Sequence, residues 1–338
     1  MTLSVPTRED GGMSRVRTVA AILGLGVLAV ACSSGDGGPS LPSGPTGNPS
    51  GMVAVAASTD LYRGDPQRLA FGLIMPDNSL VSFGTVDVAF SLVGDAAAGA
   101  APEPGPTATA TFVPTFGTPE GSSGPVVTSP TEGRGVYEAT DVVFDTGGFW
   151  VAEVTADIEG LGPQTAQATF AVLEHPALPA PSDEAPRTEN LTLDSKGVPP
   201  AAIDSRAANE GRVPDPELHE WTIARAIQEG RPALIVFATP VFCVSRFCGP
   251  VTEMVEQLAH RYDDRAVFIH VEIWENHHTQ VLNQAAIDWL QTPNGELTEP
   301  WLFLIGADGR VVDRWSSMWS EAEVEAELEA LPPMTTKG

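Results

Sequence analysis

Positive charge is scarce in this chain of 338 residues, which carries 18 Lys and Arg against 44 Asp and Glu. The resulting net charge is -26 at pH 7. Proteins that bind nucleic acid neutralise its phosphates with clustered Lys and Arg. The charge balance therefore excludes nucleic acid as a partner, and it favours solubility instead.

Several motifs that hold cofactors or catalyse hydrolysis are also missing. The sequence has no phosphate-binding glycine loop, no hydrolase serine elbow and no HExxH zinc motif. We therefore expect neither a cofactor nor a bound metal. His260 and His270 fall on an expected helix and an expected strand, where a structural role is the commoner one.

The apolar segment near the N-terminus is too short to cross a bilayer. Residues 19–30 follow Arg15 and Arg17 and lead into the sequence LAVAC, which ends at Cys32. Small residues ahead of a cysteine resemble a bacterial lipobox. The resemblance implies that residues 1–31 are a signal peptide and that Cys32 carries the lipid. The protein would then be held on the extracytoplasmic face of the cell membrane. An ordinary signal peptide with an incidental cysteine is the alternative.

Cysteine itself is rare, with three in the chain. If Cys32 is lipidated, Cys243 and Cys248 remain as a pair in an oxidising compartment, where disulfides persist. We therefore expect a disulfide between Cys243 and Cys248.

Composition divides the rest of the chain into segments. Residues 32–51 are rich in Gly, Ser and Pro and predict a flexible tether. Residues 52–174 predict an all-β sandwich, because seven short apolar or alternating runs are separated by turn signals. These runs are 53–57, 69–75, 86–93, 107–113, 136–144, 149–158 and 167–173. Within them, residues 135–139 and 147–150 resemble the end of an immunoglobulin-like bacterial module. Residues 175–213 are Pro-rich and polar, and predict an inter-domain linker over the surface.

Strands and helices alternate from residue 214 to residue 333. The expected helices are 215–230, 250–262, 280–290 and one that begins at Ser320, and the expected strands are 233–238, 266–273, 301–305 and 310–315. This order, with Cys248-Gly249-Pro250 after the first strand and Glu299-Pro300 before the third, resembles the thioredoxin fold. The resemblance implies an α/β domain of order βαβαββα with an extra N-terminal helix. It also implies a cis-proline at Pro300 that faces the cysteines.

The two cysteines form a C-x4-C pair whose spacing limits where they lie. Residues i and i+5 of a regular helix have Cα atoms about 8.6 Å apart, whereas a disulfide needs less than about 7 Å. Cys243 must therefore lie in the loop after the strand, with Cys248 at the helix entrance. Pro250 agrees, because proline is tolerated in the first turn of a helix. The helix N-terminus then lowers the pKa of the Cys248 thiol.

The thioredoxin resemblance implies a thiol-disulfide oxidoreductase that acts on protein thiols or disulfides. Cys248 would attack, Cys243 would resolve the mixed disulfide and Pro300 would shape the substrate groove. The chain differs from thioredoxins in two respects. The cysteine spacing is two residues longer than C-x-x-C, and Val236 stands where the family has a buried acidic residue.

Two other functions fit the same residues. The first is a catalytically silent binding or scaffold lipoprotein with a structural disulfide, although closing a six-residue ring stabilises by only about 2 kcal/mol. The second is a copper metallochaperone, since two cysteines and a histidine in this fold resemble the copper-handling Sco proteins. His277 and His278 are the histidines that could approach the cysteines, but adjacent loop histidines are more often exposed.

Overall fold

The structure is a computed structural model that describes residues 51–93, 101–119, 121–245 and 247–334. The expected signal peptide, the lipidation site Cys32 and the tether up to residue 50 lie outside the described residues. The described residues all belong to one compact unit. None of the helices in this part of the chain is long and apolar enough to cross a membrane.

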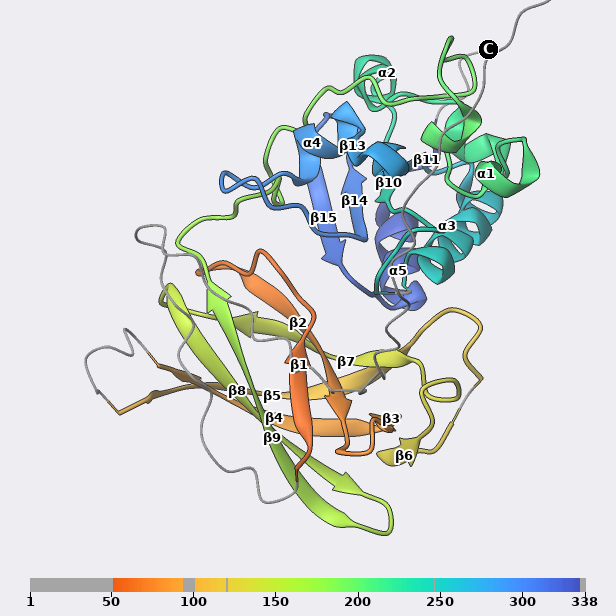
Figure 1. The fold of residues 1–338 in the computed structure, drawn as a ribbon. Helices are drawn as coiled ribbons and strands as arrows, with labels where there is room; N and C mark the ends of the chain where they lie inside the picture. The colour runs from red at the N-terminus through yellow and green to blue at the C-terminus, as the bar shows by residue number, and fades with distance from the viewer. Residues whose placement is uncertain (1–50, 94–100, 120, 246, 335–338) are drawn as a thin grey trace, which may run out of the picture. The chain divides into compact units, whose positions relative to one another are not determined.

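The N-terminal region is all-β and antiparallel, as predicted (Figure 1). Its strands are β1 (Val53–Ala56), β2 (Pro66–Ile74), β3 (Leu80–Ser82), β4 (Thr85–Leu92), β5 (Glu103–Pro114), β6 (Val126–Thr128), β7 (Gly135–Val143), β8 (Gly148–Ile158) and β9 (Gly162–Val172). Alternate residues of β4, β8 and β9 are buried, which is the pattern of strands with one face on a core. The buried faces meet around a cluster of aromatic side chains that includes Phe90, Phe144, Trp150 and Phe170.

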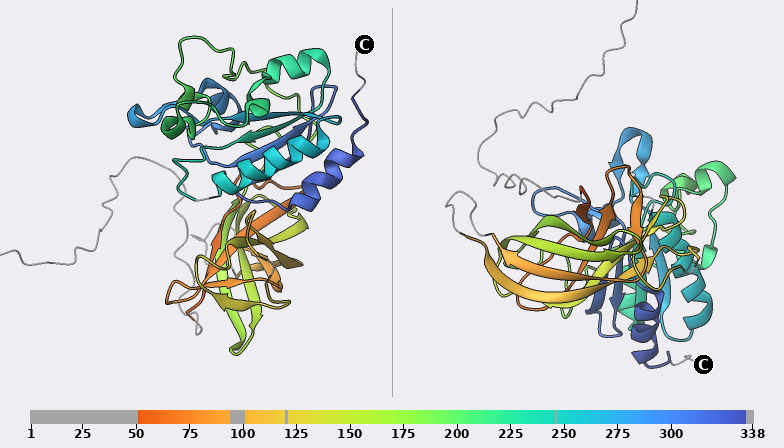
Figure 2. Two further views of the ribbon diagram at one scale, coloured as in Figure 1. Left: turned by 90° about the vertical axis from the view of Figure 1, so that its right-hand side faces the viewer. Right: turned by 90° about the horizontal axis from the view of Figure 1, so that it is seen from below.

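The pairing of these strands differs from an immunoglobulin-like sandwich of two separate sheets. The hydrogen-bonded order is β6-β3-β2-β7-β5-β4-β8-β9, with β1 paired to β2, so the ladder is continuous. A parallel bridge between Tyr62 and Leu173 joins the segment before β2 to the end of β9. The continuous sheet therefore turns over on itself and encloses its core in a sandwich-like manner (Figure 2).

The C-terminal region is a mixed α/β structure, as predicted. Its elements are η3 (Pro216–His219), α2 (Ile223–Glu229), β10 (Ala233–Phe237), α3 (Cys248–Tyr262), β11 (Val267–Val271), β12 (Trp274–Asn276), η4 (His277–Thr279), β13 (Val281–Leu282), α4 (Gln284–Leu290), β14 (Trp301–Ile305), β15 (Val311–Ser316) and α5 (Glu321–Ala330). The main sheet has the order β11-β10-β14-β15, in which β10 is parallel to β11 and antiparallel to β14. All residues of β10, β11 and β14 are buried, because side chains cover both faces of the sheet.

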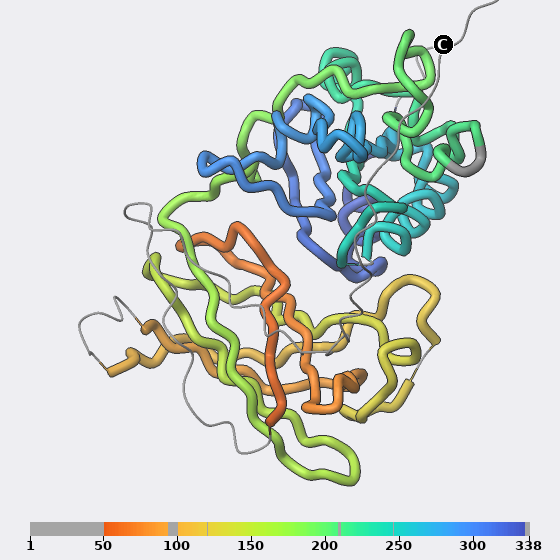
Figure 3. The backbone as a smooth tube through the Cα atoms, viewed as in Figure 1, coloured from red at the N-terminus to blue at the C-terminus, as the bar shows by residue number. Residues whose placement is uncertain are grey.

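The segment 175–213 does not lie over the surface as expected. Its backbone runs from the end of β9 along the α/β region (Figure 3) and contains η2 (Pro200–Ala202) and α1 (Ala207–Glu210). Several of its side chains are buried. Asp204 and Ser205 are completely buried against the α/β region. The expectation was wrong because the polar side chains of this segment find partners inside the α/β region, which composition alone does not reveal.

Candidate functional site

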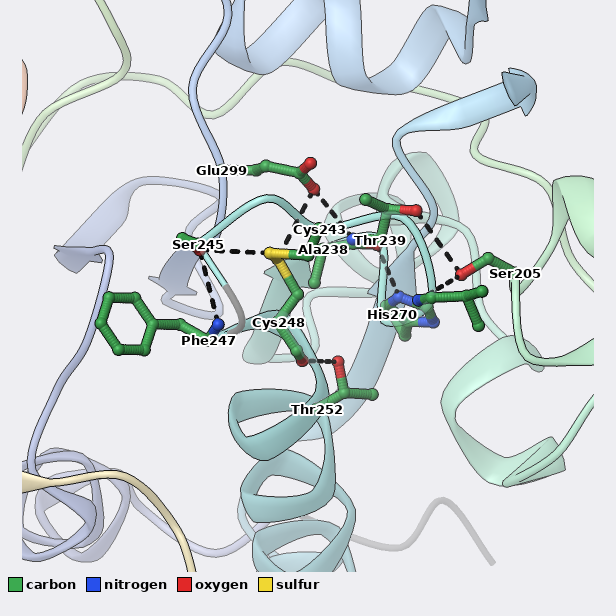
Figure 4. The surroundings of a disulfide bond; sticks show 11 residues. Ser205, Ala238, Thr239, Cys243, Ser245, Phe247, Cys248, Thr252, His270 and Glu299 are labelled. Atoms are coloured by element: carbon green, nitrogen blue, oxygen red, sulfur yellow. Dashed lines mark hydrogen bonds between the residues drawn. A yellow bond between two sulfur atoms is a disulfide. The ribbon is translucent and has the colours of Figure 1, made fainter. Parts of the chain in front are cut away.

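The disulfide joins Cys243 and Cys248 at the junction between β10 and α3, with a Cα–Cα distance of 6.0 Å (Figure 4). Cys243 lies in the loop after β10, and Cys248 is the first residue of α3. This confirms both the expected pairing and the expected placement. The α3 N-terminus has no side-chain cap, so its free N–H groups and its dipole favour negative charge at this position.

The two cysteines differ in exposure. Cys248 is completely buried, whereas Cys243 is half-buried and lies beside Val244, whose exposed fraction is 97%. The Sγ atom of Cys243 is 3.2 Å from the Oγ atom of Ser245. In a reduced pair, that hydroxyl can donate a hydrogen bond to a Cys243 thiolate.

Glu299 is an acidic side chain at the disulfide that sequence analysis did not assign to the site. Its Oε2 atom lies 3.7 Å from the Sγ atom of Cys248 and accepts a hydrogen bond from the Thr239 N–H at 2.9 Å. Burial raises the pKa of Glu299 to about 8, and the nearby charge of Glu272 adds to the increase. The carboxyl is therefore largely protonated at neutral pH and is placed to exchange a proton with Cys248.

The segment before β14 positions this carboxyl. The Glu299–Pro300 peptide bond is cis. The carbonyl of Pro300 accepts a hydrogen bond from the Ser317 N–H at 2.9 Å, and the Ser317 hydroxyl donates to the carbonyl of Ala57 at 2.7 Å. Val236, which is completely buried in β10, supplies no carboxyl, so the acid at this site comes from the turn before β14.

A second group of titratable side chains lies close by, and all three members are completely buried. The Oδ2 atom of Asp204 is 3.4 Å from Nε2 of His219 and 3.3 Å from Nδ1 of His270. Burial raises the pKa of Asp204, but contacts with His219, His270 and Arg206 outweigh it and hold this pKa well below its usual value. Burial lowers the pKa of His270, but the contact with Asp204 outweighs it and raises the pKa above the usual value.

These contacts describe a buried charge pair better than a metal site. The other ring nitrogen of His270, Nε2, lies 3.0 Å from the carbonyl oxygen of Ala238, which can only accept, so Nε2 carries a proton. The Arg206 guanidinium also binds the Asp204 carboxylate, at 2.6 Å from Oδ2. A cation in this group would therefore compete with the Arg206 guanidinium for one carboxylate.

The other histidines near the disulfide divide as follows. The His277 ring stacks on Phe242, the neighbour of Cys243, with ring centroids 3.9 Å apart. His278 is exposed. Cys243, Cys248 and Glu299 bring potential ligand atoms within 4.8 Å of one another, but the two sulfurs are bonded to each other in this state. The histidines thus form no copper site with the cysteines among the described residues.

No protein-family model matches the chain, and a search of the curated proteins likewise finds no match. The chemistry of the site therefore rests on its own geometry. A disulfide lies at a helix N-terminus, with one sulfur accessible, the other buried and a proton-binding carboxyl against the buried one. This arrangement can perform thiol-disulfide exchange.

Proposed function

We propose that the C-terminal region is a thioredoxin-like domain and that the protein exchanges disulfides with protein substrates through Cys243 and Cys248. The observation that carries the proposal is the disulfide at the β10–α3 junction, directly opposite the Glu299–Pro300 turn. The sheet order and strand directions support the fold. For the N-terminal region, an immunoglobulin-like topology stays a prediction, since its strands form one continuous ladder.

Burial supports the reverse of the roles that sequence analysis gave to the two cysteines. A nucleophile must reach the substrate sulfur, and Cys243 is the accessible member of the pair. In the reducing direction, the Cys243 thiolate attacks a substrate disulfide and releases one substrate thiolate. Cys248 then attacks Cys243, releases the second substrate thiol and forms the disulfide that the structure contains. The same steps in reverse oxidise a substrate dithiol.

The location of the protein at the cell membrane is part of the same proposal. Lipidation at Cys32 would hold the domain on the extracytoplasmic face of the membrane, where disulfide substrates are common. The net charge of -26 favours substrates that are neutral or basic near their cysteines.

Single cysteine variants test the exchange directly. In Cys248→Ser, the accessible Cys243 remains, so incubation with a disulfide-containing polypeptide should accumulate a mixed disulfide that mass spectrometry locates at Cys243. In Cys243→Ser, the buried Cys248 should form at least about tenfold less adduct, because access limits its attack. Adducts of equal yield on both variants would contradict the assigned roles. Absence of adducts on both would contradict exchange.

Complete burial of Cys248 also favours a second candidate function, a scaffold protein in which the disulfide is a fixed cross-link. The behaviour of the wild-type disulfide in glutathione distinguishes the two functions. In a scaffold the disulfide stays oxidised, because structural disulfides resist reduction by glutathione, whereas in an exchange protein it equilibrates with the added thiols.

A further inference from the structure

We propose that Glu299 is the proton acceptor and donor for Cys248, and therefore controls the step in which Cys248 attacks or leaves the disulfide. This inference rests on the exchange function proposed above and deepens it. Thioredoxin-like proteins carry their buried acid on the central strand, where this chain has Val236. Here the carboxyl arrives from the turn before β14 instead.

Geometry separates Glu299 from the other carboxyl groups near the site. Its Oε2 atom is 3.7 Å from Cys248 Sγ, on the sulfur that solvent does not reach (Figure 4). The Thr239 N–H donates to the same Oε2 atom at 2.9 Å and fixes it in this position. A buried thiol has no access to water as a base, so a carboxyl in contact with it is the available route for the proton.

Glu272 is the other buried acid near the site, but its carboxyl oxygens bind backbone N–H groups and not a cysteine sulfur. Its Oε2 atom accepts a hydrogen bond from the Ser205 N–H at 2.8 Å, and its Oε1 atom accepts one from the Trp274 N–H at 3.3 Å. Both oxygens are thus engaged by backbone donors of the segment 204–206 and of β12. Glu272 acts on Glu299 through its charge, as His270 does with the opposite sign.

The groups that face Glu299 come from three sides. Cys243 belongs to the loop after β10 and Cys248 to α3. His270 belongs to β11, and Glu272 is the residue after that strand. Burial together with Glu272 raises the pKa of Glu299 to about 8, against a smaller opposing effect of the Thr239 hydrogen bond and His270. The carboxyl therefore changes its protonation within the range in which thiols react.

In the step in which Cys248 resolves the mixed disulfide, Glu299 is the group that accepts the proton and later releases it. In the mixed disulfide between Cys243 and a substrate, the Glu299 carboxylate takes the proton of the Cys248 thiol. The Cys248 thiolate attacks Cys243 Sγ, so the Cys243–Cys248 bond forms and the bond to the substrate sulfur breaks. The substrate leaves as a thiolate and takes the proton from Glu299.

A stopped-flow reaction with Ellman's reagent separates the two steps. The full chain carries Cys32→Ser in every variant, so that Cys243 and Cys248 are its only thiols. The reduced protein should release one aromatic thiol as Cys243 attacks, and a second as Cys248 resolves the adduct. In Glu299→Gln, the second phase at pH 7 should be slower by about tenfold or more, because a general-base effect of at least about 100-fold acts through the roughly one tenth of Glu299 carboxyls that are ionised at this pH. The first phase should change less than about twofold.

The direction of this change is diagnostic. Glutamine keeps an oxygen for the Thr239 N–H but removes the negative charge that the ionised fraction of Glu299 places beside Cys248, so electrostatics alone would make the thiolate easier to form. A proton acceptor predicts the opposite result, a slower second phase. The wild-type second phase should rise with pH to a plateau above about pH 8. The Glu299→Gln phase should keep rising beyond that pH, and Glu299→Asp should restore part of the wild-type profile.

Two matched variants complete the experiment. Glu296→Gln, an exposed position three residues before Glu299, should leave both phases unchanged. Glu272→Gln should keep the second phase but reach its plateau at a lower pH, because loss of the Glu272 charge lowers the Glu299 pKa while the Glu272 side chain itself does not contact the sulfur. A Glu299→Gln protein with the wild-type second phase overturns this proposal while exchange stands. A wild-type protein that releases no second thiol overturns the exchange function itself.

Discussion

Glu138 is a buried acid whose protonation is linked to stability. It lies on β7 with an exposed fraction of 6%, near Arg68, Asp313 and Glu323. Burial raises its pKa to about 8, the charge of Glu323 adds to the increase, and Arg68 opposes it. Because the pKa is raised in the folded state, the folded protein holds this proton more tightly than the unfolded chain. The stability it contributes is present below the unfolded pKa, about 4.3, and is lost as the pH rises through about 8.

Removal of that carboxyl should flatten the dependence of stability on pH. Between pH 6 and pH 9, the free energy of unfolding should fall by about 2 kcal/mol less in Glu138→Gln than in wild type. Urea denaturation of the oxidised protein at both values measures this difference. Glu103→Gln, an exposed position on β5, serves as the control and should follow wild type. Equal pH slopes for Glu138→Gln and wild type would contradict the raised pKa.

At this scale the sequence predicted the disulfide and missed the acid. The bridge followed from the cysteine count and the expected oxidising compartment, and its placement followed from the spacing of Cys243 and Cys248 together with Pro250. Glu299 was missed because a buried acid is expected on the central strand, where this chain has Val236. The available signal was its position immediately before Pro300, a residue expected to face the cysteines. Asp204 was missed because its burial depends on tertiary contacts with His219 and His270.

At the scale of elements, the cross-link fixes the loop between β10 and α3. Residues 239–247 have no regular secondary structure in their described part, and one of their few backbone hydrogen bonds runs from the Cys243 N–H to the Thr239 carbonyl. Strand β10, in contrast, pairs on both sides with β11 and β14. The disulfide thus restrains a short irregular segment that is attached to a rigid sheet.

Reduction should therefore loosen this loop without loosening the sheet. We expect amide hydrogen exchange within residues 240–250 to accelerate by about tenfold when the pair is reduced, and exchange in β10 to stay the same. Mass spectrometry of peptides from the oxidised and reduced protein measures both segments. Uniform acceleration that includes β10 would show instead that the disulfide supports the whole α/β region.

Elements with a continuous apolar run or a repeated apolar spacing were predicted correctly, whereas the shortest strands were not. The buried runs of β10, β11 and β14 and the apolar positions of α3 were identified from their patterns. Strands β3, β6 and β12 have three residues each, too few to show alternation. The expected helix over 215–230 is divided into η3 and α2, because Thr222 begins a new helix and accepts a hydrogen bond from the Arg225 N–H.

At the scale of the molecule, ion pairs join the β region to the strand β15 and helix α5. Arg68 on β2 contacts Asp313 at 2.7 Å and Glu323 at 2.5 Å. Arg314 pairs with Asp60 at 2.6 Å, and both side chains are at least nine-tenths buried. Asp60 and Ala57 both lie in the segment after β1. The Ala57 carbonyl accepts a hydrogen bond from the Ser317 hydroxyl, and the Ser317 N–H donates to the Pro300 carbonyl. The β region thus supports the side of the site that carries Glu299, a relation that sequence segments considered one by one do not show.

In the proposed function, the Cys243–Cys248 pair exchanges electrons with external thiols and is not a fixed cross-link. Equilibration of the full chain in glutathione and dithiothreitol buffers, followed by alkylation and mass spectrometry, gives its reduction potential. An exchanging pair should have a midpoint between about -120 and -270 mV, the range of proteins that exchange disulfides. A pair that remains oxidised below about -300 mV would contradict the exchange function and identify the disulfide as structural.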